Sequence, residues 1–201
     1  MLQKNSHVKN KNMQDICRLR IINKLKSVYR INSVQKRKES SAEHSWSALV
    51  LADYFLSKDG FEKKYNINRL KAYELLIYHD AVEIESGDTP IKPGTDDLDK
   101  KEREKKAAET LKEKLPAQIS SKFIMLFSEF KEQKTIEAKF AKAIDALDAE
   151  IHELDYKKDW KGFTKEFLIE KKLHYFEDFP ELKEVFYEIL SYLADNNYFD
   201  N

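Results

Sequence analysis

Residues 75–90 read LLIYHDAVEIESGDTP, and this stretch places three ionisable side chains inside an apolar segment. His79, Asp80 and Glu83 follow the run Leu-Leu-Ile-Tyr at a spacing that puts them on neighbouring stripes of one helix. Burying carboxylates without compensation costs roughly several kcal/mol. A divalent metal ion would compensate for that cost. The alternative is a helix end that turns its carboxylates to solvent.

Two other segments with helical periodicity carry polar side chains beside apolar ones. His44 shares a stripe with apolar residues at i+4, i+7 and i+11, so its imidazole is expected to face the core. A lone histidine of this kind is more often a core residue bonded to backbone than a ligand. Asp145 and Asp148 flank the apolar stripe of residues 140–154, and spacing alone leaves open which of them faces inward.

Glycine and proline positions divide the chain into helices. Only four of each occur, and all fall between segments of helical periodicity, while no long alternating run indicates a sheet. We therefore predict an all-α, compact, single-domain helical bundle preceded by a mobile N-terminus, residues 1–12. The helices are expected at about 14–28, 42–57, 67–85, 99–115, 118–131, 135–156, 163–177 and 180–195.

Composition excludes several classes of protein. The 201 residues contain 36 Lys+Arg and 36 Asp+Glu, and zero net charge argues against a nucleic-acid polymer as partner. A small phosphorylated metabolite needs only a local basic pocket. A single cysteine, Cys17, rules out an intrachain disulfide, and no segment is apolar enough for a secretion signal or a membrane helix. A cytoplasmic protein without a membrane partner is expected.

A family resemblance rests on four segments that occur in a fixed order. They are LKSVYR (25–30), RKESSAEHSW (37–46), HDAVEIESGDTP (79–90) and AKAIDALD (141–148). With them the chain resembles the HD-domain phosphohydrolases, in particular the branch that contains the 5′-deoxynucleotidases. The resemblance implies an HD-domain helical core with a metal site over residues 13–156. The C-terminal helices of residues 157–201 are expected to pack on the same domain.

The resemblance also implies roles for individual residues. It implies metal ligands at His44, at the His79-Asp80 pair and at Asp145, with Asp148 as the rival for the last place. It further implies catalytic carboxylates at Glu83 and Asp88. Glu83 would orient or deprotonate the attacking water, and Asp88 would protonate the leaving oxygen or bind the sugar.

Two arginines are candidates for binding the substrate phosphate. Arg30 and Arg37 match basic positions of the similar family members, and a guanidinium favours bidentate contact with phosphate. The alternative is that either is an ordinary surface arginine. The 5′-deoxynucleotidases carry a Trp next to their phosphate-binding Arg, whereas Tyr29 precedes Arg30 here. This difference leaves the preference between deoxy and ribo substrates open.

Two imidazoles and two carboxylates leave open positions on a six-coordinate ion. Mixed nitrogen and oxygen ligands suit one Mn²⁺, Co²⁺, Fe²⁺, Ni²⁺ or Zn²⁺ ion per chain better than Mg²⁺. The expected activity is metal-dependent removal of phosphate from a small phosphomonoester, a (deoxy)nucleoside 5′-monophosphate. The alternatives are a di-iron HD-type oxygenase, which needs additional histidine ligands, and a non-catalytic metabolite-binding protein. The family resemblance implies a homodimer.

Overall fold

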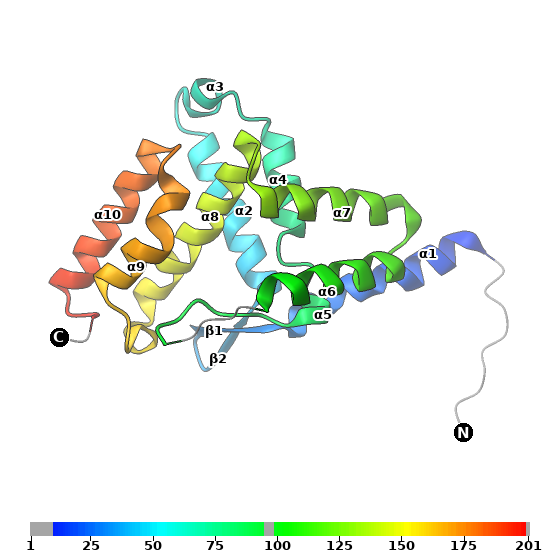
Figure 1. The fold of residues 1–201 in the computed structure, drawn as a ribbon, viewed down its shortest axis with the longest axis horizontal. Coiled ribbons are helices and arrows are strands. Elements are labelled where there is room, and N and C mark those ends of the chain that lie inside the picture. The colour runs from blue at the N-terminus through cyan, green and yellow to red at the C-terminus, as the bar shows by residue number, and fades with distance from the viewer. Residues whose placement is uncertain (1–9, 95–98, 200–201) are drawn as a thin grey trace.

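The computed structural model describes residues 10–94 and 99–199, which form a helical bundle with one small hairpin (Figure 1). The hairpin pairs β1 (Tyr29–Val34) with β2 (Arg37–Ser40) in antiparallel fashion. Four short 3₁₀ helices are η1 (Arg20–Ser27), η2 (Glu153–Asp155), η3 (Lys157–Trp160) and η4 (Leu173–Phe176). The α-helices are α1 (Lys11–Leu19), α2 (Ser41–Leu56), α3 (Phe61–Tyr65), α4 (Arg69–Tyr78), α5 (Glu83–Ser86), α6 (Lys100–Lys114), α7 (Ala117–Glu132), α8 (Ile136–His152), α9 (Lys165–Lys172) and α10 (Pro180–Asp195).

Side-chain caps fix where the central helices begin. Ser40 and Glu43 form a capping box at α2, in which the Ser40 side chain accepts from the Glu43 amide and Glu43 accepts from the Ser40 amide. Asn68 caps α4 and Thr135 caps α8, each through a side-chain oxygen that accepts a backbone N–H. Such caps set the first turn of each helix, and therefore the register of the side chains that it carries.

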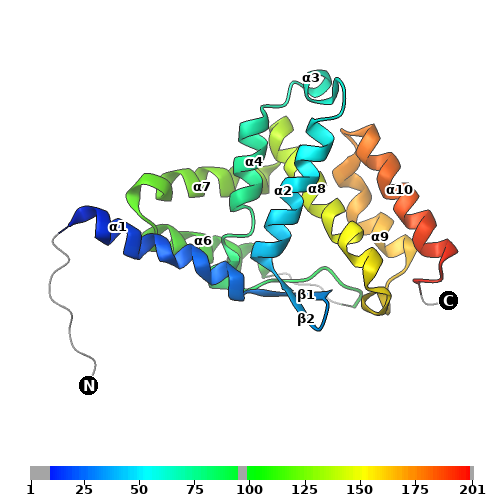
Figure 2. The ribbon, with the colours of Figure 1, turned by 180° about the vertical axis from the view of Figure 1, so that it is seen from behind.

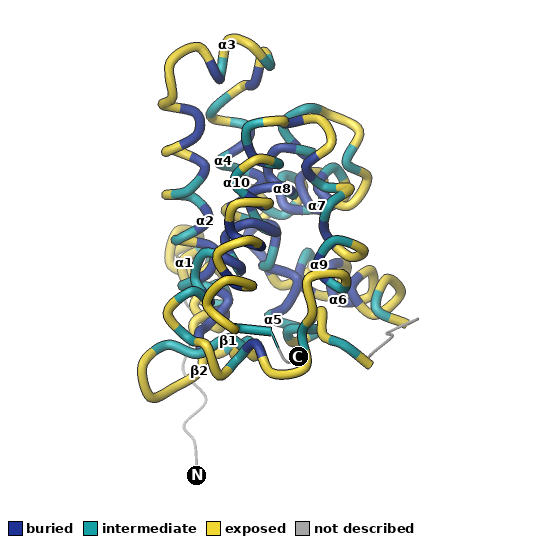
Figure 3. Tube along the Cα trace, turned by 90° about the vertical axis from the view of Figure 1, so that its left-hand side faces the viewer, coloured by how far each residue is buried: buried dark blue, intermediate teal, exposed yellow. Residues whose placement is uncertain are grey.

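The core is built around α8. This helix packs against α2, α4, α7 and α10, and Figure 2 shows α2 and α4 beside it. Phe140, Ile144 and Leu147 of the predicted apolar stripe are completely buried. Figure 3 shows α8 as a mainly buried element inside the bundle. Phe176 and Phe186 from the C-terminal part belong to the same apolar cluster, so this part shares one core with the rest. The predicted single-domain helical bundle is confirmed.

The segment 67–85, predicted as one helix, is broken in the middle. Helix α4 ends at Tyr78 and α5 begins at Glu83, with a tight turn between them in which the Ala81 amide donates to the Tyr78 carbonyl (3.1 Å). The His79 ring contributes to the break, because its Nδ1 lies 2.7 Å from the Leu76 carbonyl oxygen. In a continuous helix that carbonyl would accept the amide four residues on. Periodicity alone does not reveal such a side-chain competitor.

The N-terminal region also differs from expectation. The predicted helix 14–28 begins at Lys11, gives way to η1 after Leu19 and is followed by the hairpin, which the sequence did not predict. In β1 the exposed residues Tyr29 and Ile31 are apolar, whereas Arg30 and Asn32 are more buried, and β2 contains no apolar residue. The apolar-in, polar-out pattern of a half-buried strand is therefore missing. Lys11 and Asn12 belong to α1, and the rest of the expected mobile N-terminus, residues 1–9, lies outside the described residues. No helix within the described ranges is both long and apolar enough to cross a membrane.

Candidate metal centre and its cavity

Three helical segments bring the predicted metal ligands together. His44 lies in the first turn of α2, His79 and Asp80 lie in the turn after α4, and Asp145 lies in the middle of α8. His44, His79 and Asp145 each offer one ligand atom, and these atoms all lie within 4.8 Å of one another. Both histidines are almost completely buried. Residues 101 positions apart in sequence therefore form one compact polar group inside an apolar core.

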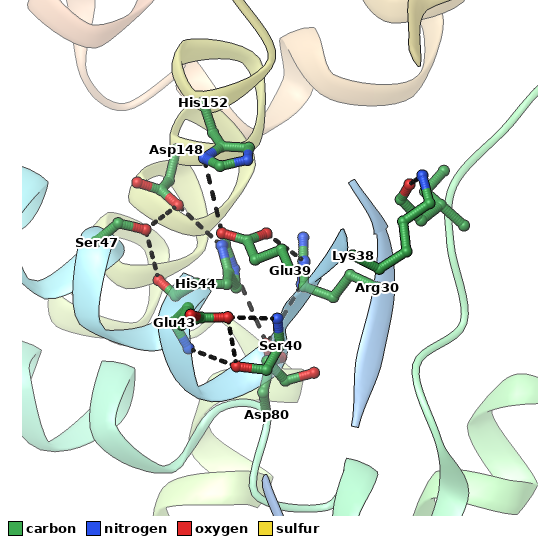
Figure 4. Close-up of polar contacts among 12 residues, drawn as sticks. Arg30, Lys38, Glu39, Ser40, Glu43, His44, Ser47, Asp80, Asp148 and His152 are labelled. Atoms are coloured by element: carbon green, nitrogen blue, oxygen red, sulfur yellow. Dashed lines mark hydrogen bonds and ion pairs between the residues drawn. The ribbon is translucent and has the colours of Figure 1, made fainter. Parts of the chain in front are cut away.

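Each histidine uses one ring nitrogen to hold its orientation. The His44 Nδ1 donates to Asp148 Oδ2 (2.8 Å), which also accepts from the Ser47 hydroxyl at 2.7 Å (Figure 4). The His79 Nδ1 donates to the Leu76 carbonyl at 2.7 Å. A metal-ligating histidine almost always donates its other N–H to a carboxylate or carbonyl in this way. Both Nε2 atoms are thereby left to face the same point.

Asp145 and Asp148 occupy different sides of His44. Asp145 Oδ1 lies 2.9 Å from His44 Nε2 and 3.6 Å from His79 Nε2, so it belongs to the convergent group. Asp148 instead contacts the Nδ1 side of His44, away from that group. Geometry therefore distinguishes the two aspartates that spacing left open. Asp145 lies in the group that could hold a metal ion, and Asp148 holds the orientation of the His44 ring.

The chemistry of the group fits a cation. The Nε2 atom of His79 is buried without a hydrogen-bond partner in the described part of the chain. Asp80 stands at the edge of the group, with one oxygen 3.3 Å from that atom and the other 3.9 Å from His44 Nε2. A buried imidazole nitrogen without a partner is costly unless something binds it. A divalent ion held by these nitrogens and carboxylates would remove the cost.

Without a metal, protons take the place of the cation. Burial acts to lower the pKa of His44, but hydrogen bonds to Asp145 and Asp148 raise it to about 9. Burial likewise opposes charge on His79, yet Asp80 and Asp145 raise its pKa to about 10. Both rings are therefore doubly protonated at neutral pH, and a metal must displace those protons. Acidic conditions consequently work against metal binding.

The two predicted catalytic carboxylates line the same cavity as the ligands. Glu83 is buried, and the Ser41 hydroxyl donates to its Oε2 at 2.6 Å. Burial, followed by the charges of Asp80 and Asp88, raises the pKa of Glu83 to about 8. A carboxylate with a pKa near the working pH is suited to proton transfer. Asp88 follows Gly87 after α5, and burial is also the main cause that raises its pKa.

Arg30 stands in the cavity as predicted. It projects from β1 with Nη1 3.4 Å from Asp80 Oδ2 and Nε 3.3 Å from Glu39 Oε2 (Figure 4). Glu39 is itself buried and also lies 3.8 Å from His152 Nδ1. Burial would lower the pKa of Arg30, but Asp80 and Asp145 raise it further above its usual range. The guanidinium is therefore a fixed positive charge beside the metal ligands.

Arg37 does not reach the cavity, so its predicted role in substrate binding is corrected. Its guanidinium is exposed and makes two contacts with the Glu43 carboxylate, one of them at 2.8 Å. Glu43 is the acidic member of the α2 capping box. The physical reason is position on the hairpin, because Arg37 opens β2 beside the turn whereas Arg30 lies at the end of β1 nearer the core. Arg37 ties the hairpin to α2.

Lys142 is a site residue that sequence reasoning missed. Its ammonium lies 2.7 Å from Asp145 Oδ2 and over the rings of Phe130 and Tyr175, at 5.4 and 5.1 Å from their centroids. It lines the same cavity as Arg30. The signal in the sequence was a lysine three residues before Asp145, which places both on one helix face. In a chain so rich in lysine that spacing is not distinctive.

A cavity of about 440 Å³ joins these groups. This volume lies within the roughly 300–1,000 Å³ of small-molecule sites. Two groups of residues line it. The first surrounds the metal ligands and comprises Arg30, His79, Asp80, Glu83, Asp88, Lys142 and Asp145. The second group of lining residues lies further along α8, in the direction of α9. The fold and this site together define a helical protein with a histidine- and carboxylate-lined metal centre that opens into a cavity.

Comparison with known proteins identifies the family. A model described as the HD domain matches residues 22–183. The chain therefore belongs to the HD-domain family of phosphohydrolases. The His79-Asp80 pair, which belongs to one of the four segments that carry the resemblance, lies in the turn between α4 and α5.

Individual relatives are distant. The 5′-deoxynucleotidase HDDC2 of Bos taurus and that of Homo sapiens are each 27% identical over 141 residues, or 69% of this chain. The match spans only 65% and 66% of those two proteins. A predicted metal-dependent phosphohydrolase from Magnetospirillum magnetotacticum has a TM-score of 0.81 and 27% identity, with 98% of this chain and 99% of that chain covered. An HD-domain phosphohydrolase from Listeria innocua shares the fold, at a TM-score of 0.56, 22% identity and coverage of 88% and 83%.

Proposed function

We propose that this protein removes phosphate from a small phosphomonoester, a (deoxy)nucleoside 5′-monophosphate, with one divalent transition-metal ion per chain. His44, His79, Asp80 and Asp145 would hold the ion. The observation that carries the proposal is the convergence of two oriented imidazoles and Asp145 beside a cavity whose lining includes Arg30 and Lys142 close to them. The name 5′-deoxynucleotidase of the HDDC2 relatives supports the nucleotide part. At 27% identity, this name does not indicate whether the protein prefers deoxyribose or ribose in its substrate.

The residues around the proposed ligands have different roles in hydrolysis of the phosphate ester. When bound, a divalent ion supplies Lewis-acid charge to the phosphoryl group and makes a bound water more acidic. Arg30 and Lys142 add fixed positive charge on the same side of the cavity, which favours a phosphate over an uncharged ester. Glu83 accepts the proton of the attacking water, with Ser41 holding its Oε2. Asp88 delivers a proton to the leaving oxygen.

The di-iron alternative lacks support among the described residues. It requires further histidine ligands, and His152 at the end of α8 is a candidate. Its Nε2 lies 2.8 Å from the Ser33 carbonyl, and its ring stacks on Tyr156. It therefore holds the hairpin rather than the ligand group. Metal analysis that finds two irons per chain would contradict the one-ion proposal.

The test is metal-dependent release of inorganic phosphate from a panel of deoxy- and ribonucleoside monophosphates. Asp80→Asn should lower kcat/KM by more than about 100-fold, because loss of a ligand exceeds the 10–100-fold effect of losing an orienting residue. Asp59→Asn, an exposed aspartate beyond α2, is the matched control and should keep full activity. Equal activity of Asp80→Asn and the parent protein would refute the proposal. Tight binding of metabolites without turnover would favour the non-catalytic alternative.

A further inference from the structure

The cavity extends well beyond the metal ligands along one face of α8. Asp145, Ala149 and Glu153 line it in turn, with Glu153 in η2 directly after the helix. At about 1.5 Å per residue, eight residues separate Asp145 from Glu153 by roughly 12 Å along the helix. If the substrate phosphate lies near Asp145, the far end of the cavity is therefore occupied by a part of the substrate distant from the phosphate. An extended nucleoside monophosphate spans such a distance, whereas a short aminoalkyl phosphate does not.

Aromatic side chains line the end of the cavity that is distant from the metal ligands. Trp160 comes from η3, Phe163 precedes α9, and Phe167 and Leu168 lie in α9; all line the cavity. Figures 1 and 2 both show α9 beside α8, and these rings line the same cavity as the row that begins at Asp145. Flat aromatic walls favour a planar ring, which stacks on them, over a sugar or an alkyl chain.

The same cavity is also lined by a buried polar group, some of whose acceptors have no hydrogen-bond partner among the described residues. Glu150, Glu153 and Lys172 are each more than nine-tenths buried and line the cavity. Lys172 donates to one Glu150 oxygen and to the Ala146 carbonyl. Glu150 Oε2 and both Glu153 oxygens have no hydrogen-bond partner in the described part of the chain. Asn32 lies near enough to favour the charged form of Glu153, without hydrogen-bond geometry.

Buried carboxylate oxygens that lack hydrogen-bond partners among the described residues point to a ligand that supplies hydrogen-bond donors. A buried acceptor without a donor costs about 1–3 kcal/mol. Burial, reinforced by the charge of Asp159, raises the pKa of Glu153 to about 8, as expected for a carboxylate that lacks donors. A ligand that presents N–H groups here would satisfy these oxygens. A ligand that presents carbonyl oxygens would oppose them.

We propose that the far end of the cavity selects a nucleobase with an exocyclic amino group, whose N–H hydrogens Glu150 and Glu153 accept. The proposal rests on the proposed nucleotide phosphatase and specifies its substrate class. Cytosine carries the amino group at C4 and adenine at C6, whereas guanine carries it at C2 beside a carbonyl oxygen at C6. Uracil and thymine have a carbonyl oxygen at C4, so this edge would face the carboxylates unfavourably.

The sharpest test compares dCMP with dUMP, which differ in one amino group against one carbonyl oxygen. Above about pH 8, where Glu153 is ionised, we expect kcat/KM to favour dCMP by at least about 10-fold, because the carboxylate accepts the amino N–H and repels the carbonyl oxygen of uracil. Below that pH Glu153 carries a proton that it can donate to a carbonyl, so the preference should shrink. Glu153→Gln should reduce this ratio to within about 3-fold, because the amide presents a donor as well as an acceptor. Glu153 makes no hydrogen bond that the substitution would break. Glu102→Gln, an exposed glutamate on α6, is the control and should leave the ratio unchanged.

A second measurement separates this proposal from the proposed function. Binding of deoxycytidine and deoxyuridine, which carry no phosphate, is followed by NMR on the full-length protein. Tighter binding of deoxycytidine, lost in Glu153→Gln, supports base selection even if neither p-nitrophenyl phosphate nor any nucleotide is hydrolysed. Hydrolysis of both nucleotides at equal kcat/KM, or equal binding of the two nucleosides, overturns it while the phosphatase can still stand.

Discussion

At the residue scale, the metal centre depends on which nitrogen of each imidazole the fold uses. Asp148 and the Leu76 carbonyl take the Nδ1 atoms of His44 and His79, so both Nε2 atoms turn to Asp145. This arrangement gives the two aspartates of α8 different tasks although they are three residues apart. Asp145 lies in the group that could bind a metal ion, and Asp148 holds the His44 ring in place.

A pair of substitutions tests that division. Asp145→Asn should abolish Mn²⁺ binding measured by calorimetry, whereas Asp148→Asn should weaken it by about 10–100-fold, the usual effect of losing an orienting partner. Ser47→Ala removes only one donor to Asp148 and should have the smallest effect. The assignment is wrong if Asp148→Asn abolishes binding while Asp145→Asn retains it.

At the scale of elements, the β1–β2 hairpin and the start of α2 act as one unit. The hairpin carries Arg30 and Glu39 to the cavity side, while Arg37 and the capping box fasten it to α2. His44 follows the cap by one turn, so the cap also sets the depth at which this ligand enters the core. Local hydrogen bonding at a helix start thereby positions a residue of the site.

Removing the cap should therefore destabilise the protein. Ser40→Ala deletes the oxygen that accepts the Glu43 amide and should lower the free energy of unfolding by about 0.5–2 kcal/mol, as measured by urea denaturation. Ser40→Thr retains the hydroxyl and should lose clearly less. Equal stability of Ser40→Ala and the parent protein would show that the cap contributes nothing.

At the scale of the whole molecule, one core supports both ends of the cavity. Phe176, Phe179 and Phe186 from the C-terminal part lie completely buried against α8 and its neighbours. The same part supplies the aromatic wall at the far end of the cavity. Metal centre and wall are therefore expected to form and unfold together rather than as separate units.

Adjacent aromatic residues on α10 provide the test. Phe186→Ala should cost about 3–5 kcal/mol of unfolding free energy, because it leaves a cavity in a completely packed core. Tyr187→Ala removes a ring that is 42% exposed and should change stability much less. Thermal unfolding followed by circular dichroism and by tryptophan fluorescence should show one coincident transition. Two separate transitions would mean that the C-terminal part is an independent unit.

Much of the site was predictable because its signals are local in sequence. His44, the His79-Asp80 pair and Glu83 are polar residues within apolar helical stripes. The structure places His79, Asp80 and Glu83 on one cavity, and His44 lies in one group with His79 and Asp145. Arg37 was predicted to bind substrate although it does not line the cavity, and Lys142 was not predicted although it lines the cavity. Both differences have the same cause. Many charged residues have suitable spacing, and only contacts with distant segments decide which of them face the cavity.

The sequence by itself determined a helical bundle and predicted candidate metal ligands, with one place left open between Asp145 and Asp148, since side-chain periodicity and short motifs are properties of neighbouring residues. Tertiary structure alone decided three further features. They are the break that His79 makes after α4, the separate tasks of Asp145 and Asp148, and the far end of the cavity with its unused carboxylates. Each depends on hydrogen bonds and packing between atoms that the chain brings together only when it folds.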